Sequence, residues 1–272
     1  MPRMPAMPPR SLLLEARRKA ANAVRKVARM ATAAQARLRP EAIRRKGEGD
    51  FVTIVDERAE QMLKKLLLAA VPEAGFIGEE SGYDNCDRDL VWVVDPIDGT
   101  SNFARGLPHW AVAVALLYRW QPIVATMWCS PEQVLYEAIR GHGAFRAGRR
   151  LSLGQGRWDD GSLVGCQWYR GQPDMPFVER LQSGGCRIRT FGCTVTQICD
   201  VVHGRLDANV QQQGRLWDIA APGLLLEVAG GQFTDWSGKP VFPTDGPDPG
   251  HISTVAASEP LHEPILKLIG ST

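Results

Sequence analysis

The sequence has no long hydrophobic run, and this absence limits the classes of protein it can belong to. No stretch approaches the ~18 consecutive apolar residues that a membrane-spanning helix needs, so we expect no membrane span. The N-terminus also lacks the apolar core of a secretory signal peptide. An apolar content of 44% and a charged content of 23% are ordinary for a soluble globular protein.

Cysteine and histidine patterns with a known chemistry are also missing. The six cysteines include no C-x-x-C pair, and the five histidines show no zinc-site spacing. Without a signal peptide, we expect the cysteines to be reduced thiols of a cytoplasmic protein. Residues 141–146 resemble a dinucleotide-binding glycine loop, but they lack its third glycine and its following helix. We therefore expect a β-hairpin there.

Charge is unevenly distributed along the chain. Residues 1–46 hold thirteen Lys or Arg and two acidic residues, whereas the rest of the chain holds nineteen and twenty-eight. An acidic body suits cation binding and argues against nucleic-acid binding by the core. The basic N-terminal segment could be the solvated face of a helix, an organelle transit peptide or a nucleic-acid-binding surface. Apolar residues at every third or fourth position over residues 11–38 favour a structural amphipathic helix.

The periodicity of the chain predicts a short tail followed by two subdomains. Residues 1–10 are rich in proline and are expected to be disordered. Residues 11–150 read as an α+β subdomain, with a second helix to about residue 70 and strands near 110–118, 121–128 and 135–139. Residues 151–272 read as an α/β subdomain in which short apolar runs and helical runs alternate. Within it, the glycine- and proline-rich residues 236–250 predict a surface loop.

Residues 89–103 contain the most informative stretch of the sequence. The apolar run at 90–94 is typical of a strand buried on both faces, and two acids, Asp95 and Asp98, follow it. Because Pro96 cannot continue a central strand, we expect the strand to end at Asp95. Two carboxylates ~4 Å apart at an effective dielectric constant of ~20 repel each other by roughly 4 kcal/mol. A divalent cation between them would reverse that sign, so we predict a metal site beside an anion-binding turn.

Three further acids lie at the ends of apolar segments. Asp56 begins a helix, where it could be only a helix cap; Glu79 follows a short apolar run, where it could be only a solvated loop residue; Asp218 lies in the first turn of a helix. Together with Asp95 and Asp98 they form the set of oxygen ligands that Mg²⁺-assisted phosphoryl chemistry requires.

Four segments of the chain resemble the inositol monophosphatase family. These segments are residues 46–56, ending in DFVTIVD, residues 78–81 (GEES), residues 92–103 (WVVDPIDGTSNF) and residues 217–221 (WDIAA). The resemblance covers nearly all of residues 11–270. It implies a layered αβαβα sandwich of the inositol monophosphatase/fructose-1,6-bisphosphatase type, in the α+β or α/β class, and a homodimer. It also implies a Mg²⁺-dependent, lithium-sensitive phosphatase that acts on a small phosphorylated substrate.

The resemblance also assigns roles to individual residues. It implies that two or three Mg²⁺ ions are bound by Glu79, Asp95, the carbonyl of Ile97, Asp98 and Asp218. Thr100, hydrogen-bonded to Asp56, would orient a water molecule activated by the cations, and Glu79 would assist. The residues implied to contact the substrate are Asp98, Gly99, Thr100, Ser101, Gly192, Thr194 and Gln211.

The alcohol end of the implied substrate site departs from the family pattern. The inositol phosphatases of the family carry a glutamate seven residues before the Trp-Asp aspartate, and here that position is Gln211. Thr194 also stands where a smaller residue is common. Inositol 1-phosphate is therefore a default expectation, and histidinol phosphate, a sugar phosphate or a 3′-nucleotide remain open. A regulatory, nucleic-acid-associated member of the family that uses the basic N-terminal helix is the alternative class.

Overall fold

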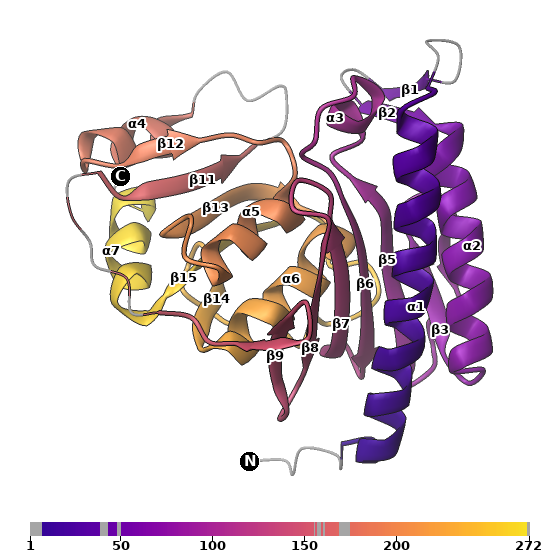
Figure 1. Ribbon diagram of the computed structural model, residues 1–272. Coiled ribbons are helices and arrows are strands. Elements are labelled where there is room, and N and C mark those ends of the chain that lie inside the picture. The colour runs from indigo at the N-terminus through magenta and orange to yellow at the C-terminus, as the bar shows by residue number, and fades with distance from the viewer. Residues whose placement is uncertain are drawn as a thin grey trace.

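A computed structural model describes residues 7–38, 43–47, 50–154, 156, 159, 161–168 and 175–270, with only the backbone of 43–47 and 50–52. These residues form five layers, in which helices and sheets alternate (Figure 1). The expected αβαβα sandwich is confirmed. Residues 1–6 of the predicted tail lie outside the described residues, and residues 7–9 precede the first helix.

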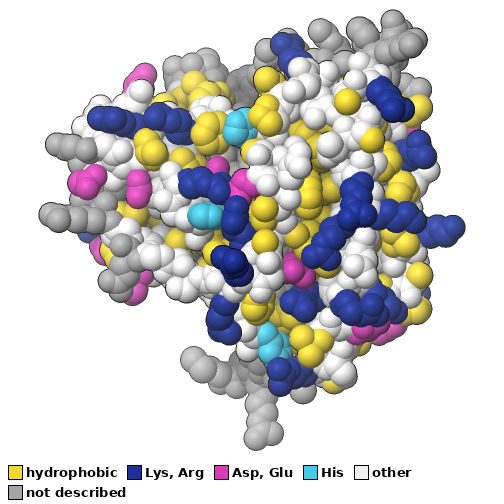
Figure 2. All heavy atoms as spheres, viewed as in Figure 1, with side chains coloured by type: hydrophobic (Ala, Val, Ile, Leu, Met, Phe, Trp, Pro, Cys, Tyr) yellow, Lys and Arg dark blue, Asp and Glu magenta, His cyan; other side chains and the backbone are white. Residues whose placement is uncertain are grey.

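Helices α1 (Arg10–Gln35) and α2 (Ile54–Ala70) form one outer layer. The buried stripe of α1 is mostly alanine and valine, and these small side chains let the helix pack closely on α2 and on the sheet beneath. Most of its basic residues, among them Arg18, Arg25 and Lys26, remain exposed, and Figure 2 shows Lys and Arg side chains over this layer. The predicted helix is therefore confirmed as a structural element, although it ends at Gln35.

The second layer is an eight-stranded sheet with the order β10-β9-β8-β7-β6-β5-β3-β4. Its strands from β5 to β10 form an antiparallel meander, and β3 pairs parallel to β5. The predicted strands β6 to β8 and the hairpin that leads into β9 are confirmed. The strands are β3 (Gly75–Gly78), β4 (Gly82–Asp84), β5 (Leu90–Asp98), β6 (Ala111–Tyr118), β7 (Gln121–Cys129), β8 (Val134–Ile139), β9 (Gly143–Arg146) and β10 (Arg149–Leu151).

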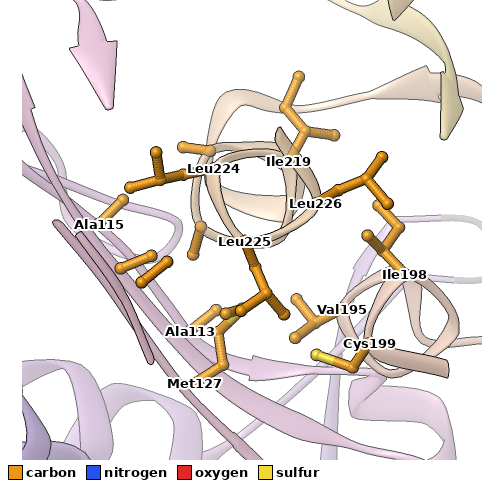
Figure 3. Packing of buried hydrophobic residues seen from close by; sticks show 14 of the residues in the cluster. Ala113, Ala115, Met127, Val195, Ile198, Cys199, Ile219, Leu224, Leu225 and Leu226 are labelled. Carbon is orange, nitrogen blue, oxygen red and sulfur yellow. The ribbon is translucent and has the colours of Figure 1, made fainter. Parts of the chain in front are cut away.

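Helices α5 (Thr194–Val202) and α6 (Leu216–Ala229) form the central layer between the two large sheets. A helix that is covered on every side must be apolar all round, and α6 has eleven buried residues out of fourteen. Figure 3 shows Leu225 of α6 pointing toward Ala113 and Met127 of the eight-stranded sheet and toward Val195 of α5. One hydrophobic core therefore joins the sequence before and after residue 150.

The last two layers are a five-stranded sheet, with the order β12-β11-β13-β15-β14, and the helices that cover its outer face. Its strands are β11 (Leu163–Gln167), β12 (Arg187–Arg189), β13 (Ala208–Gly214), β14 (Gly231–Asp235) and β15 (Ile252–Ser258). The covering helices are α4 (Pro176–Ser183) and α7 (Glu259–Gly270). Because β11, β12 and β13 are mutually parallel, their carboxyl ends lie at one edge of the sheet.

Two expectations from the sequence are wrong in detail. Strand β5 does not end at Asp95 but continues through Pro96 to Asp98, because the pairing with β6 shifts register between the two aspartates. A bulge releases a residue from the ladder, so a proline there leaves no ladder hydrogen bond unmade. The stretch 236–250 is not wholly superficial, since Val241 and Phe242 are buried. The division into subdomains near residue 150 stays a prediction.

Two small elements complete the described chain. Strands β1 (Ile43–Gly47) and β2 (Asp50–Thr53) form a two-stranded antiparallel sheet, and α3 (Thr100–Ala104) follows β5. Within the residues described, no helix is long and apolar enough to cross a membrane.

Candidate active site

The carboxyl end of β5 carries the two aspartates of the central motif. Asp95 is 1% exposed, and its Oδ1 has no hydrogen-bond partner among the described residues. Burial raises the pKa of Asp95 well above its usual value, and four acidic neighbours raise it further. These neighbours, in decreasing order of their effect, are Glu79, Asp98, Asp218 and Asp56. The four other acids singled out in the sequence are therefore close enough to Asp95 to act on it electrostatically.

Glu79 is brought to Asp95 by the pairing of β3 with β5. The last registered pair of these parallel strands is Gly78 with Val94, so Glu79 and Asp95 follow side by side. The Glu79 amide also donates to the Val94 carbonyl at 3.3 Å. The short apolar run before Glu79 is thus β3 of the large sheet. Glu79 directly follows the carboxyl end of this strand, beside Asp95, and is not in a solvated loop.

Asp98 is held by the N-terminus of α5, which belongs to the central layer. Its Oδ2 accepts hydrogen bonds from the Val195 amide at 2.6 Å and from the Cys193 thiol at 3.0 Å. Burial raises the pKa of Asp98, while these donors and the amides of Thr194 and Gly99 lower it. These two hydrogen bonds anchor Oδ2 of Asp98 to the loop before α5 and to the first turn of α5.

Asp218 comes from the third residue of α6 and is 7% exposed. Its Oδ2 accepts the Arg215 amide at 2.9 Å, as an acid in the first turn of a helix commonly does. The local fold therefore explains the position of Asp218 in the sequence, and the packing of α6 against β5 explains how it reaches Asp95.

Asp56 and Thr100 form a second small cluster beside the aspartates. Asp56 is fully buried and lies in the first turn of α2, where its Oδ2 accepts the Thr53 amide at 2.9 Å and the Thr53 hydroxyl at 2.5 Å. Its Oδ1 lies 3.2 Å from the Thr100 hydroxyl, which is also 3.0 Å from the Ile97 carbonyl. Burial raises the pKa of Asp56, and the hydrogen bonds from Thr53 and Thr100 lower it. Asp56 is thus part of a helix-capping box and also a partner of Thr100.

The turn between β5 and α3 needs a glycine at its centre. Gly99 has φ +85°, and a Cβ there would lie 2.7 Å from the His109 carbonyl oxygen. The first amides of a helix have no partner within it, so Thr100 and Ser101 at the start of α3 present donors at this turn. The Gly99 amide already donates to the Asp98 carboxylate.

The loop before α5, at residues 191–193, lies against the turn that follows β5. The Asn102 side chain donates to the carbonyls of His109 and Phe191, both at 2.7 Å, and Gly192 packs against the same amide. Thr194, the first residue of α5, is 3% exposed. The structure therefore places Gly192 and Thr194 next to the Asp98 turn.

Gln211 lies deeper, on the face of β13 that meets the central helices. It is 0% exposed, and neither its Oε1 nor its Nε2 has a hydrogen-bond partner in the described part of the chain. Gln167 on β11 and Thr254 on β15 are its cross-strand neighbours, and each also has an unpaired buried oxygen. We call Gln167, Gln211 and Thr254 the polar row. Buried polar atoms are normally satisfied, so an unpaired row is a candidate contact for a bound polar molecule or for water.

The acids fit a hard divalent cation by their chemistry. All the donors are oxygens, which is the preference of Mg²⁺, and the unpaired Oδ1 of Asp95 lies among four other carboxylates. Among the described residues no three His, Cys, Asp or Glu side chains are already arranged as a complete metal site. The donor set therefore fits a divalent cation by the chemistry of its oxygens.

Comparison with known sequences decides the family. Residues 10–271 match the inositol monophosphatase family. The chain belongs to the inositol monophosphatase family. Family membership supports a phosphatase, and it agrees with the resemblance seen in the four sequence segments.

Relatives within the inositol monophosphatase family carry two kinds of name. The chain is 34% identical to an inositol-1-monophosphatase of Caulobacter vibrioides, over 83% of this chain and 89% of that protein. It is also 34% identical to Nus factor SuhB of Escherichia coli, over 73% and 78%. Among solved structures, an IMPase of Thermotoga maritima aligns with a TM-score of 0.81 and 25% identity, over 92% and 94% of the two chains.

Some residues around the candidate site were not singled out by the sequence. Asn102 lies within the recognised motif, yet only the fold shows that it joins two loops. Cys193 looked like one of six unremarkable thiols, and its contact with Asp98 spans 95 residues. Glu60 of α2 was not singled out either, yet it is 3% exposed. An acid one turn after Asp56 on the same helix was the available signal for Glu60.

Proposed function

We propose that this protein is a Mg²⁺-dependent phosphoric monoester hydrolase that acts on a small phosphorylated alcohol. The observation that carries the proposal is the convergence of four acids from separate elements on the buried, partly unpaired Asp95. Glu79, Asp95, Asp98, Asp218 and the carbonyl of Ile97 would hold the cations. When bound, Mg²⁺ supplies Lewis-acid stabilisation of charge on the phosphate and makes water a stronger nucleophile.

The protein's own groups would then position the attacking water. The Thr100 hydroxyl donates its proton to Asp56 or to Ile97, which leaves an oxygen lone pair to accept a hydrogen bond from water. Asp56 cannot turn away, because Thr53 binds its other oxygen twice. The water is thereby held at a fixed place beside the aspartates, and fixed placement is a large part of the catalysis of phosphoryl transfer. The amides at the start of α3 would hold phosphate oxygens, with Gly99, Thr100 and Ser101 lining that end of the site.

The direct test is phosphate release from a panel of phosphate monoesters with Mg²⁺, with EDTA and with added Li⁺. We expect release that requires Mg²⁺ and falls in millimolar Li⁺, and we expect Asp98→Asn to abolish it. Comparing kcat/KM across inositol, histidinol, sugar and 3′-nucleotide phosphates then identifies the substrate class. Full release in EDTA would refute the metal assignment. A non-catalytic, regulatory protein that keeps the fold would release no phosphate under any of these conditions.

The polar row gives a specific expectation for the leaving alcohol. Gln211 is neutral and can both donate and accept a hydrogen bond, whereas a glutamate there could only accept while ionised. Gln211→Glu should therefore shift relative kcat/KM toward inositol phosphates, whose hydroxyls can donate, by about 10-fold or more. Gln121→Glu, at the half-buried first residue of β7, is the matched control and should leave the profile unchanged. An unchanged profile in Gln211→Glu would remove Gln211 from the alcohol site.

A further inference from the structure

Helix α2 contains a second buried acid, Glu60, which has no role in the proposed reaction. Asp56 and Glu60 are four residues apart, so they lie on the same face of the helix, one turn from each other. Asp56 is 0% exposed and Glu60 is 3% exposed. Asp56 contacts Thr100. Glu60 reaches a different part of the site.

Both carboxylate oxygens of Glu60 bind the turn that follows β3. Oε2 accepts the amide of Glu80 and Oε1 accepts the amide of Ser81, each at 2.8 Å. Gly78 makes this approach possible, because a Cβ at that position would lie 2.3 Å from the same Oε2. The Glu60 carboxylate therefore fits between the end of β3 and the turn. Any residue larger than glycine at position 78 would clash with it.

The two hydrogen bonds to Glu60, which we call the clamp, lie directly after Glu79, a proposed metal ligand. On one side, the amide of Glu79 donates to the Val94 carbonyl of β5. On the other side, the next two amides are held by Glu60. The backbone of Glu79 is thus fixed from the sheet and from α2, which fixes the direction in which its side chain leaves the chain.

We propose that Glu60 is a positioning residue that presents the Glu79 carboxylate to Asp95 for cation binding. This proposal rests on the proposed function, since it gives the clamp a purpose in metal affinity. Together with the Asp56–Thr100 contact, it makes one face of α2 the support for both the metal ligand and the water-positioning hydroxyl. Groups that hold a metal ligand in place commonly change metal affinity by about 10- to 100-fold when removed.

The test uses the full-length protein and the variant Glu60→Gln. Glutamine keeps the size of the side chain but offers one accepting oxygen, and its NH₂ group would face an N–H donor. In the metal-free protein, hydrogen–deuterium exchange of the amides of residues 80 and 81 should become faster. Calorimetric Mg²⁺ affinity should fall by about 10- to 100-fold, while kcat at saturating Mg²⁺ should change by less than about 5-fold. Glu60→Asp keeps the charge but is one methylene shorter, so it should show the same two losses if the glutamine variant does not fold.

Glu137→Gln is the matched control, since Glu137 is a buried glutamate (6% exposed) on β8, where it lies near Arg17 of α1. It should leave both the exchange of the turn and the Mg²⁺ affinity unchanged. Unchanged exchange in the Glu60 variants, or unchanged Mg²⁺ affinity, would overturn the positioning role. If Glu137→Gln showed the same faster exchange and the same loss of Mg²⁺ affinity, Glu60 would be only a general stabilising residue, and the positioning role would be overturned as well. Wild-type protein that binds no Mg²⁺ would contradict the proposed function itself.

Discussion

Asp95→Asn should abolish Mg²⁺-dependent phosphate release and at the same time stabilise the metal-free protein. The variant removes a cation ligand, and a loss of about 10³-fold in kcat/KM corresponds to about 4 kcal/mol of transition-state stabilisation. It also removes a buried carboxylate whose Oδ1 is unpaired and whose acidic neighbours repel it. Without metal, the free energy of unfolding should therefore rise by about 1 kcal/mol, which a few degrees of Tm would report.

The stabilising effect of Asp95→Asn should depend on pH in a definite direction. Burial and its neighbours raise the pKa of Asp95. At pH values between the ordinary carboxyl pKa and this raised pKa, the folded wild-type protein therefore holds a proton on Asp95 that the unfolded chain releases. Wild-type stability without metal is then lost as the pH rises through that raised pKa. The variant has no such group, so its advantage should grow with pH. Thermal melts in EDTA at several pH values measure this.

Asp89→Asn provides the control, because Asp89 immediately precedes the same strand and pairs with Arg119 at 3.0 Å on the surface. An exposed pair contributes little, so this variant should keep its activity and gain no stability. A destabilised but active Asp95→Asn would mean that Asp95 serves the fold rather than a cation.

The sequence was most informative where chemistry and local structure require the same residues. The apolar run before Asp95, the glycine after Asp98 and the acids at element ends are each explained by a local rule, and the fold brings those acids together. The same local reasoning misplaced the end of β5, because whether Pro96 breaks a strand depends on how the neighbouring strand β6 pairs with it. Register depends on both paired strands, so it could not be predicted from the sequence of β5 alone.

Contacts between distant segments were beyond local reasoning. The bond from Cys193 to Asp98 and the clamp of Glu60 on the turn at residue 80 depend on how whole layers stack. The polar row is similar, since glutamines read as surface residues until β11, β13 and β15 are placed side by side.

Thr100→Ala should lower kcat by about 10²-fold or more while changing KM by less than about 3-fold. The Thr100 hydroxyl lies 3.2 Å from Asp56 Oδ1, and no other described contact of that carboxylate oxygen reaches the β5–α3 turn. Removing the hydroxyl would leave the attacking water without its orienting partner, whereas the groups proposed to bind phosphate and metal would all remain. A loss confined to kcat is the signature of an interaction that matters at the reacting centre. Steady-state kinetics at saturating Mg²⁺ measures both constants.

Thr100→Ser separates the role of the hydroxyl from that of the methyl group. Serine keeps the donor that reaches Asp56, so its kcat should stay within about 5-fold of wild type. Asp56→Asn should resemble Thr100→Ala, because an amide nitrogen at Oδ1 cannot accept the hydroxyl proton. The double variant should then cost little more than either single one, since both remove the same hydrogen-bonded unit. Strictly additive losses, or a serine variant as slow as the alanine one, would show that Thr100 and Asp56 act separately and that the hydroxyl does not orient the water.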